Sequence, residues 1–194
     1  MPELSALGVA VHLLIATPVP ADVDLVMMAA ELRRIWQPAL TLTVDAPGTV
    51  PDGGRTIWLR FADTLGPDAH ARALGWTPFT EGRPGAVITI SPSRIRVVVA
   101  HGPSRPCGRR TGSGCVTRLS RAVARVAAHE VGHVLLGAAG HDRSGLMRAG
   151  LDRNELLDPE PAGLTLPAGI RNLLRDRKAL EARAGRTGQG PSSQ

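Results

Sequence analysis

The chain has 194 residues, a net charge of +6 and 43% hydrophobic residues, a composition that fits one globular domain and excludes wholesale disorder. Aromatic residues make up only 3%, so a core must be built from aliphatic side chains and alanine. The positive charge comes from arginines scattered along the chain, and stacking residues are scarce, so a nucleic-acid partner is not expected. No apolar run approaches the length of a membrane span.

The N-terminal half predicts a small sheet and one amphipathic helix. Four apolar runs have the length and the boundaries of strands: 7–15, 40–44, 56–61 and 86–90. Between the first two runs, a helix is expected to begin at Ala21 or Asp22 and to end at Pro38, because apolar residues recur there at helical spacing.

The middle of the chain is less regular. Residues 62–85 read as an irregular stretch with room for a helical turn near 68–74, and residues 94–100 fit either a strand or a helix. The longest predicted helix covers 116–136 and ends at Gly137, since glycine accepts the left-handed conformation that a helix C-terminus favours.

The C-terminal part predicts a short helix at 152–157 and a terminal helix at about 167–184. Residues 185–194 have the composition of a disordered tail. We therefore expect a single domain over 1–184 with its core at about 7–150.

The cysteine content and the N-terminal sequence bear on the cellular compartment of the protein. Two cysteines, Cys107 and Cys115, are too few for a disulfide framework, although one local disulfide can join them. The apolar N-terminal run lacks a basic region before it, so it reads as a strand and not as a signal peptide. A cytoplasmic location is the default, and secretion stays open if the chain is trimmed or exported without a leader. No feature of the sequence favours a particular oligomeric state.

The segment from His129 to His133 reads His-Glu-Val-Gly-His, an HExxH motif inside an apolar helical run. Residues four apart lie on the same face of a helix, so His129 and His133 can bind one metal ion. Two imidazoles and one further ligand leave a zinc ion an open position for water. Glu130 is close enough along the helix to reach that water as a general base.

A third ligand is needed, and His141 is the first candidate. It lies eight residues after His133 and beyond Gly137, where the chain can turn back towards the metal. Glu155 is the rival, because other HExxH enzymes take a glutamate from a later helix. Asp142 is a weaker alternative.

Together these residues resemble the zinc peptidases known as metzincins. Metzincins carry HExxHxxGxxH and then a methionine in a tight turn below the metal. This chain reads HExxHxxxGxxxH from His129 to His141, with Met147 after it. Gly137 comes one residue later and His141 two residues later than in the family pattern, which suggests a divergent bacterial branch.

The resemblance covers roughly residues 7–150 and implies an α+β, metzincin-like zincin fold. In that fold a small mixed sheet packs on an N-terminal helix and an active-site helix. The resemblance also implies that Met147 is a packing floor below the zinc and that the strand at 86–90 pairs with an extended substrate.

The predicted activity is zinc-dependent hydrolysis of peptide bonds, with an endopeptidase as the expected form. Zinc bound by His129, His133 and His141 lowers the pKa of its water, and Glu130 takes a proton from that water and passes it to the leaving amine. Two alternatives stay open. One is a cytoplasmic regulatory HExxH peptidase that acts on one specific protein, and the other is a non-enzymatic basic binding protein in which the histidines are incidental.

Overall fold

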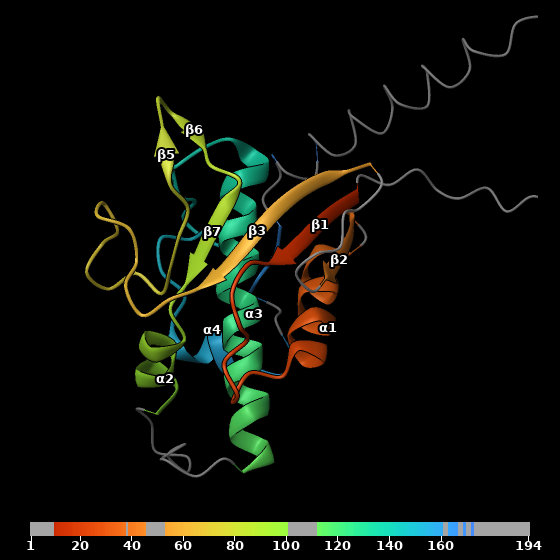
Figure 1. Ribbon diagram of the computed structural model, residues 1–194, viewed down its shortest axis with the longest axis vertical. Helices are drawn as coiled ribbons and strands as arrows, with labels where there is room; N and C mark the ends of the chain where they lie inside the picture. Colours follow the sequence, from red (N-terminus) through yellow and green to blue (C-terminus); the bar gives the residue numbers. More distant parts are fainter. Residues whose placement is uncertain are drawn as a thin grey trace, which may run out of the picture.

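The computed structural model describes residues 10–37, 39–45, 53–100, 112–160 and 163–166, together with residues 169 and 172. Its centre is a five-stranded sheet with strands in the order β2, β1, β3, β7 and β4 (Figure 1). The bounds of these strands are Thr41–Asp45, Ala10–Ile15, Arg55–Phe61, Val87–Ile90 and Gly75–Trp76. The first four run parallel, and β4 runs antiparallel beside β7.

The central strand β3 shows how the sequence selects one face of the sheet for the core. Ile57, Leu59 and Phe61 are buried, whereas Trp58 and Arg60 between them are exposed. Side chains of a strand point alternately to its two faces, so these three buried side chains all reach the face that the helices cover.

Helix α1 (Leu25–Trp36) follows β1 and leads back to the parallel strand β2. The carboxylate of Asp24 caps it by accepting hydrogen bonds from the backbone N–H groups of Val26 and Met27. Its buried stripe faces the sheet and α3. The hydrophobic members of that stripe are Met28, Ala29, Leu32, Ile35 and Trp36.

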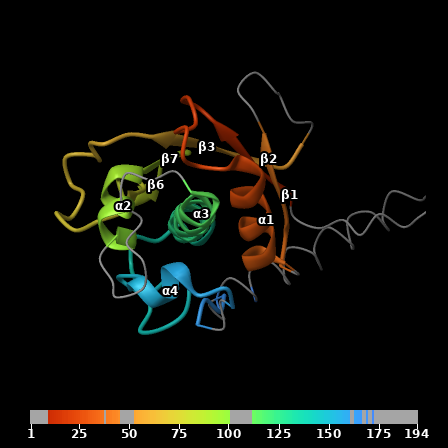
Figure 2. The same cartoon turned by 90° about the horizontal axis from the view of Figure 1, so that it is seen from below.

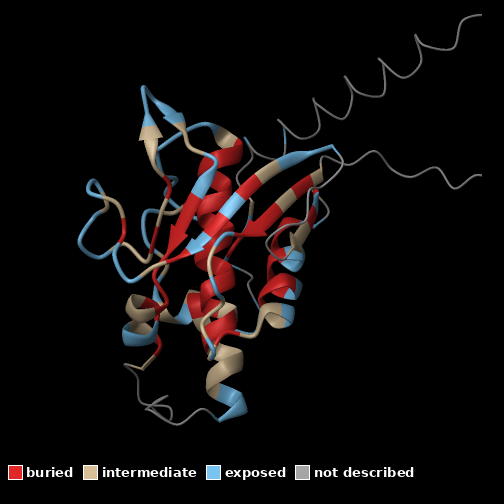
Figure 3. Ribbon diagram, in the orientation of Figure 1, coloured by how far each residue is buried: buried red, intermediate tan, exposed pale blue. Residues whose placement is uncertain are grey.

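Helix α3 (Ser113–Leu136) contacts the three other helices named here. It lies beside α1 on one side of the sheet, and α2 (Pro92–Ala100) and α4 (Arg153–Leu157) pack on its other sides (Figure 2). Most of its length is buried, and its exposed residues are confined to its N-terminal end (Figure 3). Because α3 is enclosed, the few polar side chains on its C-terminal half are held inside the domain.

Several sequence expectations are corrected. Helix α1 begins at Leu25 and not at residue 21 or 22, because Asp24 is the residue that caps it. No helical turn forms at 68–74, where the chain makes hydrogen-bonded turns. Residues 94–100 belong to α2, so the helical alternative was correct.

The stretch that reads as irregular also contains three strands of two residues each. They are β4 and the pair β5 (Phe79–Thr80) and β6 (Arg83–Pro84). Two residues are too few to show a hydrophobic period, so pattern reasoning does not detect such strands. The predicted terminal helix and tail lie outside the described residues, apart from residues 169 and 172.

Cys115, in the first turn of α3, is disulfide-bonded. Cys107, the other cysteine of the chain, lies outside the described residues. Among the helices that are described, none is long and apolar enough to cross a membrane.

A buried ion pair joins α1, α3 and α4. The guanidinium of Arg125 is fully buried and donates to Glu31 Oε1 at 2.7 Å. It also donates to the backbone carbonyls of Glu155 and of Asp158. Burial lowers the pKa of Arg125, and the hydrogen bond with Glu31 opposes that change. Because its donors are paired, this charge can stay inside the domain and hold three helices together.

We predict that Glu31→Ala lowers the free energy of unfolding by about 3–5 kcal/mol, since it leaves the Arg125 charge buried without its carboxylate partner. The matched control is Arg34→Ala, which removes the more exposed arginine that binds the same carboxylate. That change should cost at most about 1 kcal/mol. Denaturant unfolding of the three proteins measures the difference, and equal losses for the two variants would contradict the role of Arg125.

Candidate metal centre and its cavity

Three imidazoles meet at the C-terminal end of α3. His129 and His133 lie one turn apart, and their Nε2 atoms are 3.1 Å from each other. His141 follows the helix; its ring stacks on His129, with ring centroids 5.3 Å apart, and meets His133 edge-on at 4.9 Å. One nitrogen from each ring lies within 4.8 Å of the others. The spacing that departs from the metzincin pattern therefore still brings His141 to the other two histidines.

The backbone sets the tautomer of the two helical histidines. His129 Nδ1 lies 2.7 Å from the carbonyl oxygen of Leu146, and His133 Nδ1 lies 2.8 Å from that of Ala138. A carbonyl only accepts, so each Nδ1 carries the hydrogen and each Nε2 of the neutral ring carries a lone pair. Burial lowers the pKa of His129 to about 4 and also lowers the pKa of His133, which keeps both rings neutral near pH 7.

This arrangement fits a metal ion. Two lone pairs that face each other at 3.1 Å repel unless a cation lies between them. Two nitrogen ligands of a tetrahedral zinc ion, each about 2.0 Å from the metal, are about 3.3 Å apart. The separation of the two Nε2 atoms is close to that value, and hydrogen bonds from Nδ1 to a carbonyl are typical of histidines that bind metals.

The loop after α3 is held by a hydrogen bond within the loop and by packing against the helix. Gly137 ends α3 in the left-handed conformation with φ of 67°, which turns the chain back. Further along, the N–H of Asp142 donates to the carbonyl of Met147 at 2.8 Å. Met147 is buried against Gly132, where an added Cβ would lie 2.2 Å from the methionine sulfur. The glycine inside the HExxH motif thus lets Met147 pack directly against α3 at a position between His129 and His133 in the sequence.

The rival ligands lie elsewhere. Glu155 belongs to α4, where its carboxylate accepts the N–H of Asp152 at 2.8 Å and pairs with Arg148 at 3.0 Å. Neither Glu155 nor Asp142 belongs to the cluster of ligand atoms that the three histidines form. In this structure His141 is therefore the third candidate ligand, and Glu155 instead holds α4 to the preceding loop.

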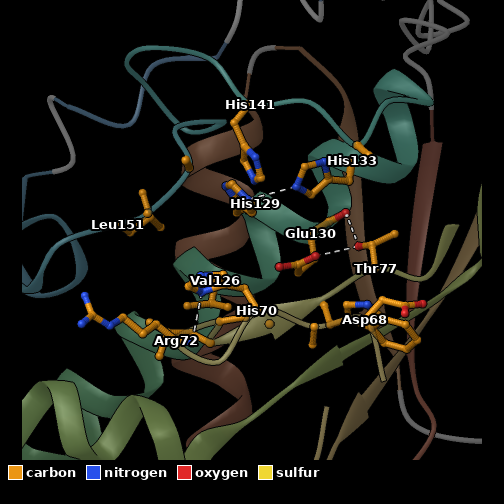
Figure 4. A pocket seen from close by; sticks show the side chains of 18 of the residues that line it. Asp68, His70, Arg72, Thr77, Val126, His129, Glu130, His133, His141 and Leu151 are labelled. Atoms are coloured by element: carbon orange, nitrogen blue, oxygen red, sulfur yellow. Dashed lines mark hydrogen bonds between the residues drawn. The ribbon is translucent and has the colours of Figure 1, made fainter. Parts of the chain in front are cut away.

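Glu130 is buried beside the histidines and accepts a hydrogen bond from Thr77 (Figure 4). The hydroxyl of Thr77 donates to Glu130 Oε2 at 2.7 Å. Burial raises the pKa of Glu130 to about 7, and the hydrogen bond from Thr77 acts in the opposite direction. Gly75 leaves room for this carboxylate, because a Cβ at that position would lie 2.7 Å from Glu130 Oε1.

Sequence reasoning missed both Thr77 and Gly75. Gly75 lies in β4 and Thr77 directly follows β4, 55 and 53 positions before Glu130, in a stretch without regular periodicity. No short motif links them to the helix, so only the tertiary structure shows the contact.

A cavity of about 670 Å³ opens beside the histidines. Its walls come from α3, β4, the loop before β4, one residue of α2 and the loop at 149–151. Figure 4 shows the histidines at one end of it, Glu130 and Val126 in the middle, and His70 and Arg72 at the other end. Several of the residues that line the cavity are apolar, among them Leu74, Trp76, Val98, Val126 and Leu151.

The expected substrate strand needs correction. Residues 87–90 form β7, which pairs with β3 on one side and, at Thr89 and Ile90, with β4 on the other. Its edge is thus already covered at Thr89 and Ile90. Within this sheet the strand that lines the cavity is β4, which is the last strand of the sheet in the described part of the chain.

Comparison with known proteins identifies a solved structure with a similar fold. No protein-family model matches the sequence, and no curated protein matches it either. Among solved structures, the crystal structure of archaemetzincin from Methanopyrus kandleri is similar, with a TM-score of 0.54 and 15% sequence identity. The match covers 93% of this chain and 99% of that chain. The protein therefore has a mixed α/β fold with a mostly parallel sheet, similar to that of archaemetzincin.

Proposed function

We propose that this protein is a zinc-dependent peptidase. The observation that carries the proposal is the pair of Nε2 lone pairs facing each other at 3.1 Å, with both Nδ1 atoms engaged by backbone carbonyls. Support also comes from the similarity in fold to archaemetzincin, whose name belongs to the metzincin group that the HExxH segment resembles.

His129, His133 and His141 would hold the zinc ion. Three neutral imidazoles suit zinc and leave a fourth position open, as in catalytic sites. When bound, zinc supplies Lewis acidity, which makes water a better nucleophile near neutral pH and polarises a carbonyl group.

Glu130 would act as the general base. It follows His129 directly in α3, and the Thr77 hydroxyl fixes one of its oxygens. Burial places its pKa at about 7, close to the pH at which a base both accepts and returns a proton efficiently. The carboxylate takes a proton from the attacking water and then donates it to the leaving amine of the cleaved peptide bond.

The substrate would be a peptide or protein in extended conformation. The outer edge of β4 lines the cavity next to Glu130, and its backbone groups can pair with a peptide as an additional strand does. The apolar residues that line the cavity would then receive side chains next to the bond that is cleaved, and endopeptidase activity is the expected form.

Metal analysis tests the centre. We expect about one zinc ion per chain in the wild-type protein and in Glu130→Gln, because Glu130 is not a ligand. Hydrolysis of a casein or peptide-mixture substrate should be lost in Glu130→Gln. After dialysis, His133→Ala and His141→Ala should retain much less zinc, whereas His70→Ala, which lines the cavity outside the cluster, should retain it. A wild-type protein without zinc affinity would overturn the proposal.

The role of Thr77 gives a second test. Thr77→Val removes the hydroxyl but preserves the shape of the side chain, so zinc content should not change. The loss of a hydrogen bond to a charged group costs about 1.5–3 kcal/mol, which corresponds to a fall of roughly 10- to 150-fold in kcat. Thr80→Val on the exposed strand β5 is the matched control and should keep full activity. If both valine variants are as active as the wild type, Thr77 does not position Glu130.

A further inference from the structure

The end of the cavity opposite the histidines carries an unpaired positive charge. Arg72 lines the cavity and is exposed. Its backbone N–H donates to His70 Nδ1, but its guanidinium forms no hydrogen bond or ion pair with any residue that the structure describes. Arg94 of α2 differs in this respect, since its Nη1 donates to two backbone carbonyls of the same loop.

The loop that presents Arg72 is held in shape. Arg94 of α2 donates from Nη1 to the carbonyl of Ala71 at 3.2 Å and to that of Ala73 at 3.0 Å. These two carbonyls flank Arg72 on either side. A turn hydrogen bond from the N–H of Ala73 to the carbonyl of His70, at 2.8 Å, closes the same segment. The backbone of Arg72 is thus positioned before any ligand arrives, which reduces the entropy that binding costs.

The charges around Arg72 favour an anion. Arg94 adds a second positive charge to the same segment, and His70 offers an imidazole beside it. The acidic side chains of the cavity are Asp68 and Glu130, and neither forms an ion pair with Arg72. Glu130 lies towards the other end, next to the histidines (Figure 4).

One cavity is lined both by Arg72 and by Glu130 and the three histidines (Figure 4). A peptide that lies in this cavity can therefore reach Arg72 while the bond to be cleaved lies at Glu130.

We propose that Arg72 binds a carboxylate of the substrate and that this enzyme selects peptides carrying a negative charge near the cleaved bond. The carboxylate can be the C-terminus of the peptide or the side chain of Asp or Glu, and a guanidinium binds either one through paired N–H donors. This assignment rests on the proposed peptidase function, because it takes the cleaved bond to lie at Glu130.

The test uses the full-length protein and matched peptides. Digestion of a peptide mixture followed by mass spectrometry identifies a cleaved sequence, and that sequence is then made with Glu or Gln at each of the three positions on either side of the bond. Each peptide is also made with a free or an amidated C-terminus. We expect one carboxylate to lower KM about tenfold with little change in kcat. Whether the effect follows a Glu residue or the free C-terminus shows which carboxylate Arg72 binds.

Variants of Arg72 assign the effect to this residue. Arg72→Gln should remove the tenfold preference while the neutral peptide is cleaved as before, and Arg72→Glu should turn the preference towards Lys at the same position. Arg55→Gln loses the same charge at an exposed site on β3 outside the cavity lining, and it should keep the preference. Equal KM values for charged and neutral peptides in the wild type, or an unchanged preference in Arg72→Gln, would overturn the assignment.

A binding measurement separates this assignment from the peptidase function. Fluorescence anisotropy with Glu130→Gln reports affinity without hydrolysis. It uses labelled peptides of one fixed sequence with Glu or Gln and with a free or an amidated C-terminus, so that no cleaved sequence has to be known. Tighter binding of carboxylate peptides that is lost on the further change Arg72→Gln supports the role of Arg72, even if the wild type cleaves nothing. Absence of zinc and of hydrolysis would count against the proposed function alone, whereas equal affinities would count against Arg72 alone.

Discussion

Two hydrogen bonds from imidazole Nδ1 atoms to backbone carbonyls determine what the centre of this protein can do. Because Leu146 and Ala138 accept these bonds, His129 and His133 present Nε2 lone pairs to each other in a buried place. Both rings are buried, so the repulsion between the lone pairs is screened less than it would be in bulk water. A zinc ion held by these nitrogens would relieve the repulsion, and the same backbone bonds would orient the two ligands.

The rest of the domain keeps those carbonyls in place. Leu146 belongs to the loop that Met147 anchors against Gly132, and α4, which follows that loop, is tied to α3 by Arg125. Arg125 lies one helical turn before His129 and carries its buried charge only because Glu31 of α1 pairs with it. The ion pair thus couples the packing of α1, α3 and α4 to the geometry of the histidine cluster. On the other side, β4 contributes Gly75, which makes room for Glu130, and Thr77 follows it and holds the carboxylate.

Sequence reasoning identified the elements whose signals are local. Strands of five or more residues, the amphipathic helix α1, the long helix α3 and its end at Gly137 were all expected from periodicity and capping chemistry, with errors of a few residues at their ends. It also selected His141, which the structure brings to His129 and His133. It did not find β4, which pairs with Thr89 and Ile90 of the strand expected to bind substrate, since a two-residue strand has no period and its partner Ile90 is 15 positions from Gly75.

The sequence by itself determined which chemistry was available: two histidines on one helical face, a glutamate between them, a later histidine, and an apolar helix in which to bury them. These features follow from the fixed geometry of a helix and need no knowledge of the fold. The tertiary structure alone decided that Glu155 pairs with Arg148, that Thr77 binds Glu130, and that the guanidinium of Arg72 lines the cavity without a partner among the described residues. The physical reason is that each of these outcomes depends on which side chains meet across elements distant in the chain, and such meetings are set by packing around α3 and not by local spacing.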